Sequence, residues 1–135
     1  MYKCKHFTIT ELVSPSTFET FGENSWLLLD EDALKTLDTI REKFGPTTVN
    51  SWSWNGDRSW SGLRTPESPW YSKYSQHTIG RAFDCIFSQT TAEEVREYIL
   101  ENQSEFPLIG GIELGTSWLH FDTRKKSGKI RTFTP

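Results

Sequence analysis

Ser75–Asp84 reads SQHTIGRAFD and Trp118–Asp122 reads WLHFD. These two stretches contain two of the three histidines of the 135-residue chain, and each histidine has a carboxylate close by. Residues 81–87 are typical of a short strand, in which successive side chains face opposite sides. Asp84 then lies among apolar strand residues, where an unpaired carboxylate is costly to bury. A bound cation would offset that cost.

His77, Asp84 and His120 are therefore the candidate metal ligands. Two imidazoles and one carboxylate leave a fourth tetrahedral position open for water, as in catalytic zinc sites. Zinc in such a site lowers the pKa of water and polarises a carbonyl group. The alternative remains open, because two histidines in strands are more often ordinary core or surface residues.

The residues that precede these stretches predict two helices. Thr8–Glu11 has the spacing of a capping box and predicts a short helix that ends before Pro15. Asp30–Phe44 predicts a longer amphipathic helix, because apolar residues recur at helical spacing and acids crowd its first turn. A Gly-Pro pair ends it, and the β-branched residues 47–51 predict a strand.

The second half of the chain predicts one helix and three short strands. Residues 90–106 have a cap, an acidic first turn and apolar residues at helical spacing. Residues 109–114, 117–123 and 129–133 are typical of strands joined by tight turns. We therefore expect a single α+β domain over residues 1–135, with helices packed on one face of a small antiparallel sheet.

Composition excludes several classes of partner. The net charge of -3 produces no field that attracts nucleic acid or acidic lipid, and no apolar run approaches the length of a membrane span. We expect a monomer that binds neither nucleic acid nor membrane. The N-terminus shows no signal peptide, so we expect synthesis in the cytoplasm. Cys4 and Cys85 predict free thiols rather than a disulfide framework.

Four of the six tryptophans lie close together in a segment rich in Ser, Gly and Pro. They are Trp52, Trp54, Trp60 and Trp70. Either this loop folds back to cover a small core, or its aromatic side chains form a wall that faces a substrate. The second alternative makes Trp52, Trp54 and Trp60 candidate substrate-binding residues.

The pattern S-x-H-x-x-G-x-A-x-D, followed by WLHFDTR, resembles the signature of zinc D-alanyl-D-alanine carboxypeptidases and L-alanyl-D-glutamate endopeptidases. These enzymes include phage endolysins and share a fold with the hedgehog signalling domain. HFTITELVSP is also similar to their N-terminal helix, so the resemblance covers most of the chain. It implies a hedgehog-like fold in which His77, Asp84 and His120 bind Zn²⁺.

The resemblance also implies roles for residues around the metal. Arg64 of SGLR would bind a substrate carboxylate or stabilise an oxyanion, although such an Arg is otherwise more often a surface charge. Ser75 would form a hydrogen bond near the metal, and Asp122 would orient a ligand or pair with Arg64 or Arg124. Turn formation is the alternative role for Ser75.

The chain departs from the family at the general base. Family members commonly have an acid three residues before the last zinc-binding histidine, and Ser117 occupies that position here. Glu113 is the best substitute, because a hairpin through residues 115–116 would bring it toward His120. An exposed carboxylate at the end of a strand is the alternative interpretation of Glu113.

Two functions follow from the resemblance. One is a zinc peptidase that hydrolyses a peptide bond in peptidoglycan stem peptides through a metal-activated water, with Glu113 and Arg64 as catalytic residues. Such an enzyme would act on the cell wall after release or as part of a phage particle. The other is a catalytically inactive zinc-binding relative that serves as a virion structural or binding domain. A metal-free carbohydrate binder with exposed Trp residues is a third alternative, but it leaves His77, Asp84 and His120 unexplained.

Overall fold

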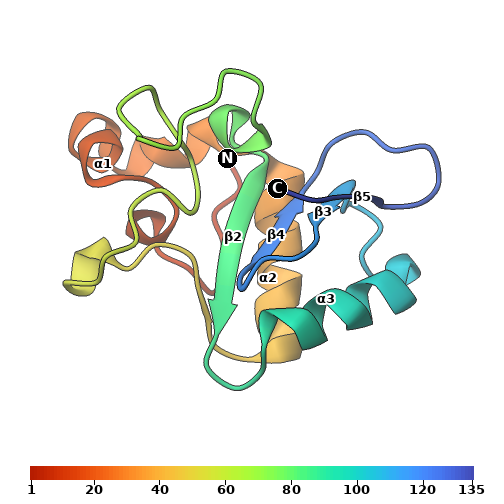
Figure 1. Cartoon of the computed structure of the whole chain (residues 1–135). Coiled ribbons are helices and arrows are strands. Elements are labelled where there is room, and N and C mark those ends of the chain that lie inside the picture. Colours follow the sequence, from red (N-terminus) through yellow and green to blue (C-terminus); the bar gives the residue numbers. More distant parts are fainter.

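One five-stranded sheet forms the centre of an α+β fold, with strand order β1-β2-β4-β3-β5 (Figure 1). The computed structural model describes residues 1–135. The strands are β1 (Thr47–Thr48), β2 (Ala82–Phe87), β3 (Gly111–Glu113), β4 (Leu119–Asp122) and β5 (Arg131–Phe133). The α-helices are α1 (Pro15–Phe21), α2 (Glu31–Phe44) and α3 (Ala92–Glu101). Five 3₁₀ helices complete the fold: η1 (Ile9–Glu11), η2 (Gly22–Leu28), η3 (Trp52–Trp54), η4 (Gln76–Ile79) and η5 (Gln103–Glu105).

Helix α2 confirms the longest predicted helix. The Asp30 side chain caps it by accepting a hydrogen bond from Ala33 N at 3.0 Å. Gly45 ends it with φ of 87°, a left-handed conformation that favours glycine. The apolar side of the helix is fully buried, which explains why its periodicity was readable in the sequence: Leu34, Leu37 and Ile40 are at most 1% exposed.

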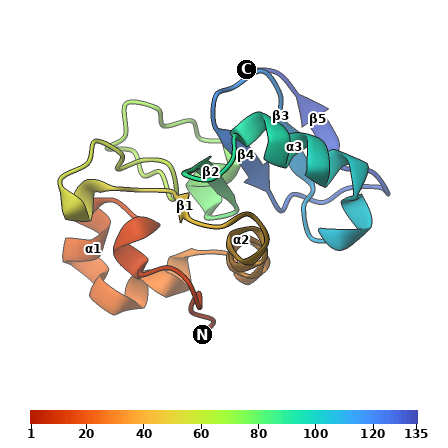
Figure 2. The same ribbon diagram turned by 90° about the horizontal axis from the view of Figure 1, so that it is seen from below.

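The two faces of the sheet have different roles. Phe83 and Phe121 are paired across β2 and β4, and both belong to the hydrophobic core of 23 buried residues. Helices α2 and α3 pack against this face, as predicted (Figure 2). Asp84 and His120 are paired on the opposite face, which the helices leave open.

None of the helices combines the length and the apolar character that a membrane span requires.

The expectation of an antiparallel sheet is wrong at the last strand. Strand β5 pairs parallel with β3, with Ile112 opposite Thr132. The sequence predicted a tight turn that would make β5 the hairpin partner of β4. Both edges of β4 are already occupied, by β2 and β3, so the returning chain adds to the free edge of β3 instead.

Helix boundaries also differ from the sequence prediction. The predicted helix before Pro15 is only the 3₁₀ turn η1, and α1 begins at Pro15 itself. Proline is favourable at the first helical position because its missing N–H has no partner there in any helix. Ser14 caps this helix by accepting from Thr17 N at 3.2 Å. Helix α3 ends at Glu101, before the predicted end at residue 106.

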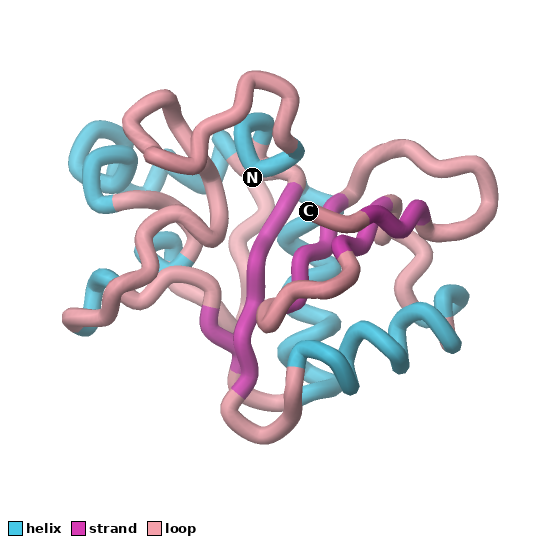
Figure 3. Tube along the Cα trace, in the orientation of Figure 1, coloured by secondary structure: helices cyan, strands magenta, loops and turns pink.

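A long loop connects η3 to η4 (Figure 3). Asn50 links this loop to the rest of the fold through hydrogen bonds. Its fully buried side chain donates to Val13 O at 3.0 Å and accepts from Ser61 N at 2.9 Å. Ser61 O in turn accepts from Asp84 N at 2.8 Å. Hydrogen bonds therefore connect the N-terminal segment, the loop and β2.

We predict that Asn50→Ala lowers the free energy of unfolding by about 2 kcal/mol, because it leaves the buried Ser61 N–H without its side-chain acceptor and removes one of the two hydrogen bonds to Val13 O. Urea denaturation measures this change. The exposed Asn24, in η2, provides a matched control, and Asn24→Ala is expected to change stability by less than about 0.5 kcal/mol. Equal effects of the two substitutions would contradict the role given to Asn50.

Candidate metal centre

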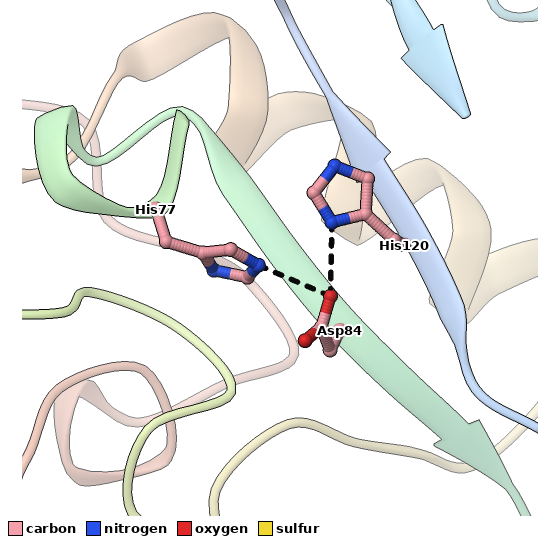
Figure 4. Close-up of side chains that lie close together, drawn as sticks. All are labelled: His77, Asp84 and His120. Atoms are coloured by element: carbon pink, nitrogen blue, oxygen red, sulfur yellow. Dashed lines mark hydrogen bonds and ion pairs between the residues drawn. The ribbon is translucent and has the colours of Figure 1, made fainter. Parts of the chain in front are cut away.

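His77, Asp84 and His120 converge on the face of the sheet opposite the helices (Figure 4). Their nearest nitrogen and oxygen atoms all lie within 4.8 Å of one another, and all three residues are buried. Asp84 Oδ1 lies 3.1 Å from His77 Nε2 and 3.0 Å from His120 Nδ1. A zinc tetrahedron with bonds of about 2.0–2.1 Å has edges of about 3.3 Å, so these separations suit the ion.

Local structure positions each of the three residues. Asp84 and His120 are directly opposite each other in the antiparallel pairing of β2 with β4, so their side chains share a face. His77 lies in η4, which Ser75 caps by accepting from His77 N at 3.2 Å. Ser75 thus positions the backbone of His77. Gly80 ends η4 with φ of 73°, where a Cβ would meet Leu28 O at 2.3 Å, so only glycine fits.

The outer nitrogen of each imidazole donates a hydrogen bond. His77 Nδ1 lies 2.9 Å from Gly62 O, a carbonyl that can only accept. His120 Nε2 lies 2.8 Å from Asp122 Oδ2, an acceptor when ionised. In the neutral rings, the inner nitrogens therefore carry lone pairs. Two such lone pairs and a carboxylate oxygen face one another, and a cation held between them satisfies all three.

The electrostatics of the cluster favour positive charge beside the two carboxylates. Burial lowers the pKa of His120, but hydrogen bonds with Asp122 and Asp84 outweigh it and raise the pKa to about 9. Burial raises the pKa of Asp84, yet hydrogen bonds with His120 and His77 bring it well below its usual range. Without a metal, an added proton on His120 supplies the missing positive charge.

Arg64 and Glu113 lie beside the cluster. Arg64 Nη2 donates to Asp84 Oδ2 at 3.0 Å, and its Nε donates to Trp60 O at 2.8 Å. Burial lowers the pKa of Arg64, while the charges of Asp84 and Glu113 oppose this effect. Glu113 follows Ile112, which pairs with Phe121, so the register continues to Glu113 beside His120. Both carboxylates are thus close to the Arg64 guanidinium.

Asp122 contacts Arg124 rather than Arg64. Arg124 donates to both carboxylate oxygens of Asp122, at 2.7 and 2.6 Å. Burial raises the pKa of Asp122, but hydrogen bonds from His120 and Arg124 lower it to about 2. Asp122 therefore stays ionised and holds the His120 ring in one tautomer. The Phe133 ring of β5 lies against His120 and Arg124, the two side chains that are hydrogen-bonded to Asp122. Its centroid is 5.5 Å from that of the His120 ring.

A cleft of about 620 Å³ opens onto the cluster, and aromatic side chains form part of its lining. These are Trp60, Trp70, Tyr74, Trp118 and Phe133. The predicted substrate-binding residues Trp52 and Trp54 do not line it. The Trp52 indole instead donates to Val13 O at 2.8 Å and packs on Phe18. Trp52 thus fits the alternative in which the loop folds back to cover the core. Trp54 is exposed, on η3.

Among the lining residues that sequence reasoning did not place in the cleft are Arg58, Trp118 and Arg124, although Arg124 was named as a possible partner of Asp122. A signal existed for two of them. Trp118 lies two positions before His120 and Arg124 four positions after it, so strand alternation would place both on the side of the metal ligands. Arg58 had no such signal, because it lies in an irregular loop.

Comparisons with protein-family models, curated proteins and solved structures found no match to this chain. The assignment of the site therefore depends on its own geometry and chemistry.

We predict that Asp122→Asn weakens zinc binding about 10- to 100-fold. Asp122 Oδ2 accepts from both His120 Nε2 and Arg124 Nη2, and Oδ1 accepts from Arg124 Nε. The neutral amide can replace only one of these oxygens with an acceptor, so its NH₂ group, itself a donor, would face the donors of His120 or Arg124. Competition with a chromophoric chelator measures the affinity. Asp57→Asn, which removes an exposed carboxylate that lines the same cleft, is the control and should leave affinity nearly unchanged. Wild-type affinity in Asp122→Asn would contradict the positioning role.

Proposed function

We propose that this protein is a zinc-dependent peptidase that hydrolyses a peptide bond in peptidoglycan stem peptides. The observation that carries the proposal is a buried site in which two imidazole nitrogens and one carboxylate oxygen face one another. The other nitrogen of each imidazole donates a hydrogen bond to an acceptor. We also propose that the α+β fold is related to that of the hedgehog-like peptidases, on the basis of the sequence resemblance.

The donor set fits zinc. Nitrogen from two imidazoles and oxygen from one carboxylate are ligands that zinc prefers, and three protein ligands are typical of catalytic sites. Bound there, zinc would supply Lewis-acid polarisation of a carbonyl group and activation of water. The open cleft gives a substrate access to this position.

The chain's own residues supply the remaining chemistry. Glu113 lines the cleft beside His120 and is suited to accept a proton from the attacking water and transfer it to the leaving amine. Arg64 brings a fixed positive charge to the same place and stabilises negative charge that develops on the substrate oxygen. Its bonds to Asp84 and Trp60 hold the guanidinium in position before substrate arrives.

A non-catalytic zinc-binding protein is the second candidate. One observation favours it: Ser117, at the position of the usual family acid, is exposed and does not line the cleft. In this alternative, zinc stabilises the fold, and the cleft binds a ligand without cleaving it. The two candidates differ in whether Glu113 has a chemical role.

We predict that the zinc-loaded protein releases peptide fragments from purified peptidoglycan, and that Glu113→Gln lowers kcat at least about 100-fold without loss of zinc. The glutamine keeps the shape of the side chain but cannot accept the proton. Chromatography of released fragments measures the rate, and metal analysis measures the zinc content.

Glu97→Gln, on the exposed side of α3, is the matched control and should retain wild-type rates. Activity that persists in Glu113→Gln would contradict the assignment of the base. If zinc-loaded wild-type protein releases no fragments from walls of several peptide compositions, the non-catalytic alternative is favoured.

A further inference from the structure

Three arginines line the cleft, and only one of them lacks a carboxylate partner. Arg64 pairs with Asp84 at 3.0 Å, and Arg124 pairs with Asp122 at 2.6 Å. Arg58 forms no salt bridge; its guanidinium makes a single hydrogen bond, from Nη1 to Ser61 Oγ at 3.4 Å. Most of its donors are therefore free in the cleft.

The backbone of Arg58 is held firmly. Arg58 N donates to Ser51 Oγ at 3.1 Å, and its carbonyl accepts from Ser51 N at 2.9 Å and Trp52 N at 3.2 Å. Close packing supports this geometry, since a Cβ on Gly56 would lie 2.2 Å from Ser51 Oγ. The arginine is thus presented from a fixed loop, which reduces the entropy lost when it binds a ligand.

Arg58 also lies close to the metal cluster. Ser61, its hydrogen-bond partner, accepts from Asp84 N through its carbonyl at 2.8 Å. Ser61 therefore links the Arg58 guanidinium directly to the strand that carries Asp84.

No carboxylate of the cleft forms a salt bridge with Arg58. Arg64 forms a salt bridge with Asp84, and Arg124 forms two hydrogen bonds to the carboxylate of Asp122. Asp57 also lines the cleft, but it is exposed and forms no salt bridge with its neighbour Arg58. A planar guanidinium with free donors in a partly buried cleft matches a carboxylate, which it can bind through two parallel hydrogen bonds.

We infer that Arg58 binds a free carboxylate of the peptide ligand and so makes this cleft selective for acidic peptides. The cleavage of such a peptide rests on the proposed function, whereas its binding does not. A lysine-containing stem peptide offers two carboxylates, the α-carboxylate of its γ-linked D-Glu and the carboxylate at its C-terminus. Both present the same chemistry to Arg58.

The test compares binding of four forms of the peptide L-Ala-γ-D-Glu-L-Lys-D-Ala to the zinc-loaded protein. One form has both carboxylates, two have one carboxylate converted to a carboxamide, and the fourth has both converted. Tryptophan fluorescence reports binding, because Trp60, Trp70 and Trp118 line the cleft. Stopped-flow mixing records it before products accumulate, and chromatography of the same samples follows cleavage.

We expect amidation of one of the two carboxylates to weaken binding to the wild-type protein about tenfold, which identifies the group that Arg58 contacts. Arg58→Gln should bind the free peptide about tenfold more weakly and no longer distinguish it from that amide. Arg58→Lys should retain part of the discrimination. Arg41→Gln, on α2 across the sheet from the cleft, should retain all of it.

Equal binding of all four peptides to the wild-type protein would overturn the inference, and this comparison does not depend on any variant folding. Discrimination that persists in folded Arg58→Gln would also overturn it. Cleavage without any dependence on a carboxylate would contradict the role of Arg58 and support the proposed function. Carboxylate-dependent binding without cleavage would support the role of Arg58 and contradict the peptidase.

Discussion

The antiparallel register between β2 and β4 is the constraint on which the rest of the site depends. It places Asp84 opposite His120 on one face and Phe83 opposite Phe121 on the other. A slip of β4 by one residue would exchange the faces, so that His120 would enter the core and Phe121 would enter the cleft. The hydrophobic core and the candidate metal centre are therefore fixed by the same pairing.

Hydrogen bonds from the surrounding chain hold the three candidate ligands in place. Gly62 O fixes His77, Asp122 fixes His120, and Arg64 occupies the second oxygen of Asp84. Buried charged groups are stable only when such hydrogen bonds accompany them. The arrangement leaves one position, between the two inner nitrogens and Asp84 Oδ1, where a cation fits.

The sequence predicted those elements in which apolar residues recur at a regular spacing because one face of the element is buried. Helix α2 was predicted because burial selects every third or fourth residue, and the convergence of the three candidate ligands followed from two short motifs. The parallel pairing of β5 was not predicted, because it depends on which strand edges are free. The sequence left open whether Trp52 faces the core or a substrate, because loop residues have no period that shows which side they face, and Arg58 was missed for the same reason.

The most direct test of the account is calorimetric titration of metal-free protein with Zn²⁺ in buffers of different ionisation enthalpy. The pKa of His120 is raised to about 9 in the metal-free fold, so this ring is protonated at about pH 7. We predict one saturable site, which is lost in His77→Ala and in His120→Ala. Zinc binding at this site should release about one proton, and this release should disappear as the pH rises through 9. Absence of a saturable site, or binding that survives both substitutions, would contradict the account.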